Sequence, residues 1–164
     1  MNLLMRVTEQ STNIGEQTLF AISGEVVERT AFRVLFVDGE NAGSSVLAEA
    51  YARANFPGSG SYESGGWEPA EHADPAVVAF LEDRGMDASA VEPSPVRVGD
   101  GPPPHVLVLI DSEGRARVDA VPFRTTLVAW ELPAASTGSL DDLYDAVGTR
   151  VDELMTTLAG PEAA

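Results

Sequence analysis

Residues 34–50 read VLFVDGENAGSSVLAEA, and this stretch decides the fold that we predict. It opens with a continuous apolar run, which is typical of a strand buried on both faces. A loop of small and polar residues follows, and apolar residues then recur at helical spacing. Ser44 or Ser45 can cap that helix. Such a strand, loop and helix start aim backbone N–H groups and the positive end of a helix dipole at one point, as in an anion site.

The same stretch resembles the phosphate loop of the low-molecular-weight protein tyrosine phosphatases and, more closely, of their arsenate reductase relatives. In that family an apolar strand is followed by Cys-x-x-Asn-x-x-Arg-Ser and a helix. This chain keeps in register Asn41, Gly43, Ser45 and residues 47–50. It departs at two positions: Asp38 stands where the family has its nucleophilic Cys, and Ser44 stands where the family has the Arg that binds the anion.

These two changes remove the groups that carry the family's chemistry. The nucleophile in such a reaction is a thiolate, and this chain contains no Cys at all. Glu40 adds a second carboxylate to the loop, and two carboxylates there repel phosphate or arsenate. The resemblance also places Leu132 where the phosphatases have their general acid. We therefore expect neither a phosphatase nor a thiol-dependent arsenate reductase, and any other enzymatic activity stays open.

Length and composition indicate one globular domain with an acidic surface. The chain has 164 residues and a formal net charge of −16, which disfavours nucleic acid and anionic membranes as partners. We find no apolar segment long enough to span a membrane and no signal-peptide pattern, so a cytoplasmic protein is the expectation. All ten basic residues are Arg, a usage that favours a GC-rich genome such as an actinobacterial one.

The resemblance covers residues 33–159 and implies an α/β fold. We predict strands over residues 33–37, 61–67, 105–111 and 125–132, with helices over 45–55, from Asp74 to Arg84, and from Leu140 to Leu158. Their alternation indicates a three-layer sandwich with a four-stranded parallel sheet flanked by helices. The family resemblance implies the strand order 2-1-3-4. A hairpin turn at residues 112–114 would add an extra strand over residues 115–121.

The resemblance divides the chain into one domain and an N-terminal extension. Residues 33–160 form the phosphatase-like α/β domain. Residues 1–32 have no counterpart in the family, and their short apolar runs and turn signals predict a β-hairpin that extends the sheet edge. The alternative for residues 1–32 is a mobile or dimer-forming arm, because edge strands invite pairing, and a homodimer is left open.

The first functional hypothesis is a catalytically degenerate relative with a binding or regulatory role. The nucleophile, the anion-binding Arg and the acid are missing together, so the ancestral reaction is absent. In this interpretation the Asp38 carboxylate lies where the substrate oxyanion once bound and accepts the N–H groups of the loop. The partner would be a protein or a small molecule, and no cofactor is expected.

The second hypothesis is a repurposed biosynthetic enzyme, for example of secondary metabolism. Asp38 and Glu40 would then perform acid–base chemistry on a neutral or cationic small molecule. The ligand would contact Gly39, Asn41, Ala42, Gly43, Ser44, Ser45, Trp67 and Asp111. Trp130 is a further candidate for the lining of such a pocket.

A third interpretation places a divalent cation between Asp38, Glu40 and Asp111. Their spacing in the sequence does not establish that they converge, so no metal ligand is assigned. The two His residues are interpreted as structural, with His72 on the surface.

Overall fold

The computed structural model describes residues 31–88, 92–97, 101–111, 114–133 and 138–159. The described elements are β1 (Phe32–Asp38), α2 (Ser44–Asn55), β2 (Gly60–Gly66), α3 (Pro75–Asp83), β3 (Val106–Leu109), α4 (Gly114–Arg117), β4 (Thr126–Ala129) and α5 (Leu140–Ala159). The predictions for residues 1–30 lie outside the described residues, and Phe32 already belongs to β1.

The sheet has the predicted topology. Its four strands are parallel and lie in the order β2-β1-β3-β4, with helices packed against the sheet, which confirms the predicted α/β fold class. β1 is central and pairs with both β2 and β3, so that Val37 lies beside Gly65 on one side and Leu109 on the other. The carboxyl ends of the strands therefore meet at one edge of the sheet, at the end of β1.

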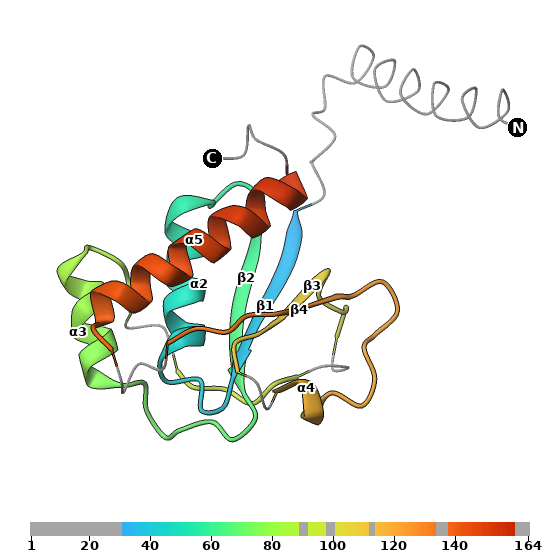
Figure 1. The fold of residues 1–164 in the computed structure, drawn as a ribbon, viewed down its shortest axis with the longest axis horizontal. Helices are drawn as coiled ribbons and strands as arrows, with labels where there is room; N and C mark the ends of the chain where they lie inside the picture. The colour runs from blue at the N-terminus through green and yellow to red at the C-terminus, as the bar shows by residue number, and fades with distance from the viewer. Residues whose placement is uncertain (1–30, 89–91, 98–100, 112–113, 134–137, 160–164) are drawn as a thin grey trace, which may run out of the picture. The chain divides into compact units, whose positions relative to one another are not determined.

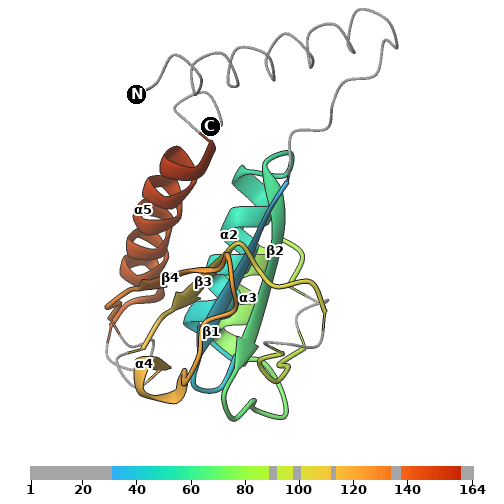
Figure 2. The same ribbon diagram turned by 90° about the vertical axis from the view of Figure 1, so that its right-hand side faces the viewer.

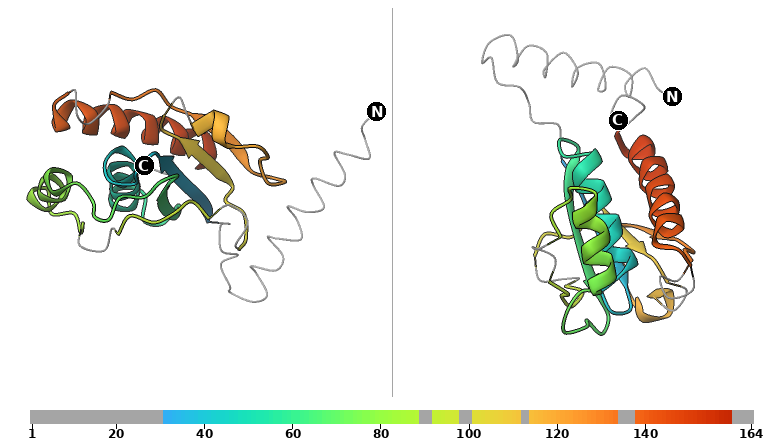
Figure 3. Two further views of the ribbon diagram at one scale, coloured as in Figure 1. Left: turned by 90° about the horizontal axis from the view of Figure 1, so that it is seen from below. Right: turned by 90° about the vertical axis from the view of Figure 1, so that its left-hand side faces the viewer.

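One face of the sheet carries the larger core. Figure 1 shows α2 and α5 on this face, and Figure 3 shows α3 beside α2. The core side chains come from all three helices and from alternate positions of β1 and β3. Its fully buried members include Val34, Phe36, Leu47, Leu81, Val106, Val108, Leu143 and Met155. Trp130 also belongs to this core, where its ring lies 5.8 Å from that of Phe36.

The opposite face of the sheet has a smaller apolar cluster. Connecting segments run over this face (Figure 2). Leu35, Val37, Leu107 and Leu109 form its buried centre. The residues that pack on them are Trp67, Val96, Val118 and Leu127. Trp67 thus has a packing role in the second core, beyond the end of β2.

The ends of α3 and the start of α5 carry residue types with known capping preferences. The Asp74 side chain caps α3 by accepting the Ala76 N–H at 2.8 Å, and Pro75 occupies the first helical position. Gly85 follows α3 with a φ of 72°, a left-handed conformation suited to glycine. At the start of α5, the Ser139 hydroxyl accepts the Asp141 N–H at 3.1 Å.

Two local predictions are wrong. The extra strand over residues 115–121 is replaced at its start by the helical turn α4, because the Asp111 carboxylate accepts the Gly114 N–H and caps that turn. Helical spacing predicts that Leu47, Ala50, Tyr51 and Ala54 of the first helix face the sheet, but Ala54 is exposed, whereas Val46, Ala48 and Ala52 are fully buried. The reason is that α2 contacts both the sheet and α5, which buries more than one stripe of its surface.

No helix among the described residues is both long enough and apolar enough to cross a membrane.

Tyr62 links β2 to the end of α2 and to α5. Its hydroxyl donates to the Phe56 carbonyl at 2.9 Å and lies 3.8 Å from the Met155 sulfur. Burial raises the pKa of Tyr62 to about 12. Tyr51 has its pKa raised to about 12 as well, by burial and by the Asp152 carboxylate that accepts its hydroxyl. The native state therefore favours the protonated form of both side chains.

We predict a loss of stability in strong alkali from these two groups. A folded pKa above the ordinary value of 10.0 contributes stability that is present below pH 10 and is lost as the pH rises to about 12. The free energy of unfolding, measured by denaturant titration across this range, should fall. Tyr62→Phe should reduce the slope of that fall while costing about 1 kcal/mol near neutral pH through the lost hydrogen bond. An unchanged slope in the variant would contradict the assignment.

Candidate functional site

The candidate site is the loop between β1 and α2, at the carboxyl end of the central strand. Gly39 to Gly43 connect the two elements, and α2 starts at Ser44. This is where open α/β sheets place their ligands. The polar residues predicted to bind a ligand lie in this loop or near the ends of neighbouring strands, and their role in binding stays a prediction.

The Asp38 carboxylate accepts two backbone N–H groups of the loop. One oxygen, Oδ1, accepts the Asn41 N–H at 2.6 Å, and the other, Oδ2, accepts the Ser45 N–H at 2.9 Å. Both carboxylate oxygens therefore point into the curve of the loop and towards the start of α2. Hydrogen bonds of this kind, between an ionised acceptor and backbone N–H groups, are among the stronger ones in proteins.

Asp38 also caps the start of α2, where we predicted a serine cap. Gly43 is the residue before the first turn of α2, and it makes no side-chain capping bond. The Ser45 N–H is one of the N–H groups that a helix start leaves without an internal partner, and it is satisfied by Asp38, seven positions earlier. The prediction that Ser44 or Ser45 caps this helix is thus wrong, because the carboxylate at the end of β1 already occupies that place.

The loop carbonyls are bonded by the segment that follows β2. Trp67 N–H donates to the Asp38 carbonyl at 3.1 Å, and Glu68 N–H donates to the Gly39 carbonyl at 2.9 Å. The same pattern continues with two more bonds, from Ala70 N–H to the Glu40 carbonyl at 2.8 Å and from Asp74 N–H to the Ala42 carbonyl at 3.0 Å. These four bonds fix the path of the loop backbone.

Asn41 holds the centre of the loop. Its φ of 51° is left-handed, a conformation that Asn adopts more readily than most other residues, and its side chain is fully buried. The amide nitrogen Nδ2 donates to the Ser45 hydroxyl at 2.9 Å, and the amide oxygen Oδ1 accepts the Ser94 N–H at 2.9 Å. Asn41 therefore ties the loop to α2 and to residues 92–97 at once.

Gly66 allows the loop to lie directly against β2. A Cβ atom at this position would come within 2.8 Å of the Asn41 nitrogen and 2.8 Å of the Glu40 carbonyl carbon. Both are backbone atoms, so a neighbouring side chain cannot simply rotate away. At Gly39, by contrast, an added Cβ would meet nothing within 4 Å.

The other predicted site residues have different surroundings. Glu40 is exposed, and Ala42, Gly43 and Ser44 are partly buried in the loop. Asp111 lies at the end of β3 and uses its carboxylate to accept the Gly114 N–H. Trp130 is buried in the larger core, so it does not line a ligand site at this edge.

The Trp67 indole nitrogen lies beside α4. This buried Nε1 has no hydrogen-bond partner among the described residues, and it would lie 3.3 Å from a Cβ atom added to Gly114. Gly114 therefore leaves room for the indole ring between α4 and the end of β3. The indole closes the second apolar cluster at this edge of the sheet.

The proposed convergence of Asp38, Glu40 and Asp111 around a cation gains no support from the described residues. Among them, no three His, Asp or Glu side chains gather in a way that could hold a metal ion. The two His residues lie elsewhere: His72 is exposed, as predicted, and His105 accepts the Arg33 N–H through Nδ1 at 3.0 Å.

Two features of the site were missed in the sequence. Ser94 belongs to a proline-rich segment that carries no motif, although it supplies the N–H group bound by Asn41. Glu49, on α2, is 6% exposed, accepts the Ser64 hydroxyl and pairs with Arg53 at 2.6 Å. The match of residues 47–50 to the family motif was the sequence signal for Glu49, but it indicated no role for the side chain.

Comparison with solved structures shows the class of fold. The thioredoxin-dependent arsenate reductase of Corynebacterium glutamicum is 22% identical, with a TM-score of 0.67, over 96% of this chain and 76% of that one. An arsenate reductase from Archaeoglobus fulgidus is 28% identical, with a TM-score of 0.61, over 75% and 98%. The tyrosine phosphatase Wzb of Escherichia coli, solved in complex with sulphate, is 17% identical, with a TM-score of 0.64, over 77% and 97%.

The protein therefore has the fold shared by low-molecular-weight tyrosine phosphatases and arsenate reductases. Within that fold it is a cysteine-free chain that carries Asp38 at the end of the first strand. Searches of protein-family models and of curated protein sequences find no match.

We predict that Gly66→Ala strongly destabilises the protein, whereas Gly39→Ala does not. The added methyl at position 66 overlaps the loop backbone, and overpacking of this kind costs about 1–3 kcal/mol. Urea titration of both variants measures the difference in the free energy of unfolding. Equal stabilities for the two variants would show that the loop does not lie against β2 as described.

A second pair of variants separates the two roles of Asn41. Asn41→Ala removes both side-chain hydrogen bonds and leaves a strained φ, so it should cost about 2–4 kcal/mol. Asn41→Gly removes the same bonds but adopts the left-handed φ without strain, so it should be less destabilising by about 1 kcal/mol. The same stability for both variants would mean that φ at this position is not left-handed.

Proposed function

We propose that this protein is a catalytically degenerate relative of the low-molecular-weight phosphatases and arsenate reductases, with a binding or regulatory role. The observation that carries the proposal is the Asp38 carboxylate, whose two oxygens accept the Asn41 and Ser45 N–H groups. In the interpretation given above, these loop N–H groups are the ones that would bind a substrate oxyanion. The protein's own side chain fills the place of the anion.

The sequence supports this proposal independently of the geometry. No Cys is present to act as a nucleophile, and Ser44 replaces the Arg that would clamp a phosphate. Glu40 is exposed next to the loop and adds negative charge at its mouth. An incoming phosphate would therefore have to displace one carboxylate and approach another.

The alternative, a repurposed acid–base enzyme, fits the contacts of Asp38 less well. A general base needs an oxygen directed at the proton that it removes, within hydrogen-bond reach. Each oxygen of Asp38 is already held by a backbone N–H group, and Glu40, the second predicted catalytic carboxylate, is exposed. A cytoplasmic location and an actinobacterial origin stay predictions from the sequence.

The proposal predicts that removing the carboxylate converts the loop into an anion site. Asp38→Ala leaves the two N–H groups without an acceptor, so it should lower the free energy of unfolding by about 2–4 kcal/mol. Inorganic phosphate or sulfate should then raise the melting temperature of Asp38→Ala, because either anion can accept the freed N–H groups at the start of α2. The wild-type protein should show only the smaller rise that these anions give folded proteins in general, by exclusion from the protein surface.

Glu40→Ala is the matched control, because it removes the same charge from an exposed side chain two residues away. This variant should keep its stability and should not gain an anion-dependent melting shift. Assays with an aryl phosphate and with arsenate plus a thiol reductant should find no turnover by the wild type. Turnover that depends on Asp38, or binding of phosphate by the wild type in the loop, would overturn the proposal.

A further inference from the structure

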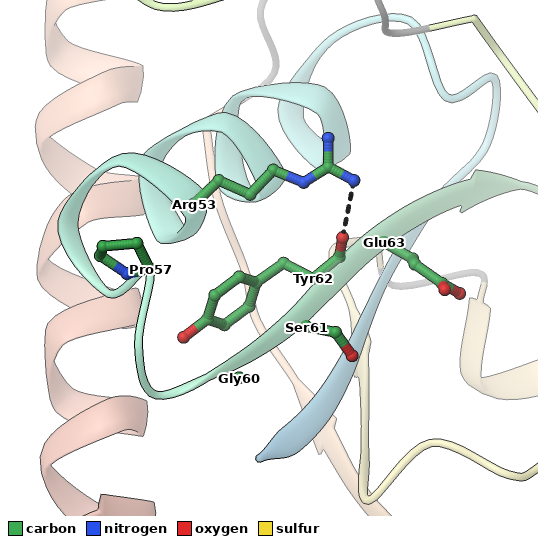
Figure 4. Close-up of a pocket in the computed structure, with 6 residues that line it drawn as sticks. All are labelled: Arg53, Pro57, Gly60, Ser61, Tyr62 and Glu63. Atoms are coloured by element: carbon green, nitrogen blue, oxygen red, sulfur yellow. Dashed lines mark hydrogen bonds between the residues drawn. The ribbon is translucent and has the colours of Figure 1, made fainter.

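The sheet has two edge strands, β2 and β4, and other parts of the protein cover the outer edge of β2. The guanidinium of Arg53 donates to the Tyr62 carbonyl at 3.0 Å, as Figure 4 shows, beside a hollow of about 310 Å³. Further along β2, the Ser94 hydroxyl donates to the Ser64 carbonyl at 3.3 Å. Gly66 exchanges two backbone hydrogen bonds with residues 94–96. A charged side chain and a covering segment are devices by which proteins block an edge strand.

β4, the opposite edge strand, has no such protection among the described residues. Thr126 N–H donates to the His105 carbonyl and Trp130 N–H to the Leu109 carbonyl, each at 2.8 Å. Because alternate residues of a strand turn to alternate sides, Leu127 and Ala129 direct their N–H and C=O groups away from β3. In the part of the chain that the structure describes, no side chain or segment donates to or accepts from these groups. The strand reads Thr-Leu-Val-Ala, without charge or proline.

The charged residues on either side of β4 make this edge complementary to the same edge of a second copy of the chain. Arg124 precedes the strand and Glu131 follows it, and both are exposed. Antiparallel pairing of two copies places the start of each strand beside the end of the other, so Arg124 lies near the oppositely charged Glu131 of the second copy. Parallel pairing would instead bring like charges together. Phe123, whose side chain is 86% exposed, lies at the same end as Arg124.

The residues just before β4 form a turn that fixes the position of Arg124. Thr125 N–H donates to the Pro122 carbonyl at 3.0 Å, and Arg124 adopts a left-handed φ of 72°. A non-glycine residue in this conformation is strained by about 1–3 kcal/mol, so the surroundings must hold the turn in place. The Thr125 hydroxyl supplies one such anchor by donating to the Pro104 carbonyl at 2.7 Å.

We propose that β4 pairs antiparallel with β4 of a second copy of this chain, joining the two sheets across a two-fold axis at Val128. In this register Leu127 of each copy lies opposite Ala129 of the other copy. The outward N–H and C=O groups of both residues therefore all gain a partner. Val128 then faces its own counterpart. The interface is short, and two acidic copies repel each other, so the association is weak and strengthens as added salt screens the charges.

The test uses the absence of Cys from the natural chain. Val128→Cys introduces a single thiol at the proposed axis, where opposite Cα atoms of a non-hydrogen-bonded pair lie about 4.5 Å apart, within the range that a disulfide bridges. Mild oxidation should therefore yield a disulfide-linked dimer. Ala129→Cys is the matched control: its thiol is exposed but offset from its own counterpart, so it should cross-link at least tenfold more slowly.

A charge-exchange series tests the same interface without a covalent bond. Arg124→Glu should weaken the dimer, measured by sedimentation equilibrium, by roughly 3- to 10-fold for the two ion pairs it removes. Adding Glu131→Arg to that variant should restore the association, because the opposite charges meet again with their positions exchanged. A fully monomeric chain at high salt and high concentration would overturn the proposal, as would a dimer in which Val128→Cys fails to cross-link. These results leave the anion-binding test of Asp38 unaffected.

Discussion

The structure of the site depends on one carboxylate that is bonded to the backbone of the following loop. Asp38 ends the central strand, and its two oxygens accept N–H groups from the middle of the loop and from the first turn of α2. A negative charge at a helix start is favourable in its own right, through the helix dipole. Since β1 contributes to both apolar clusters, the position of this charge is fixed by the core of the whole domain.

The path of the loop between β1 and α2 is set by the segment that follows β2. Residues 67–74 donate four N–H groups to its carbonyls, and Gly66 brings the two backbones into direct contact. Because the Glu40 carbonyl is held on that side, the Asn41 N–H of the same trans peptide group points to the opposite side, where Asp38 accepts it together with the Ser45 N–H at the start of α2. The concave array of N–H groups is thus a property of the scaffold and does not require a bound anion.

The sheet order was implied by the family resemblance, the strands themselves were marked by buried apolar runs, and capping residues such as Asp74 and Gly85 indicated most helix ends. The sequence also predicted that Asp38 accepts the loop N–H groups. It failed where long-range contacts decide local structure. α4 replaced a strand because Asp111 captures the Gly114 N–H, and Ser94 reaches Asn41 from a segment 53 residues away. Neither contact leaves a periodic pattern in the sequence.

A tethered carboxylate is the physical basis of the proposal that this loop does not bind free oxyanions. Asp38 is held beside the N–H groups by the strand that carries it, so its effective concentration there is on the order of millimolar or higher. A free phosphate would have to compete with that concentration, and without an Arg at position 44 it gains no charged contact to compensate. On this proposal the loop N–H groups are satisfied by the protein's own carboxylate, and a binding partner contacts other surfaces of the protein.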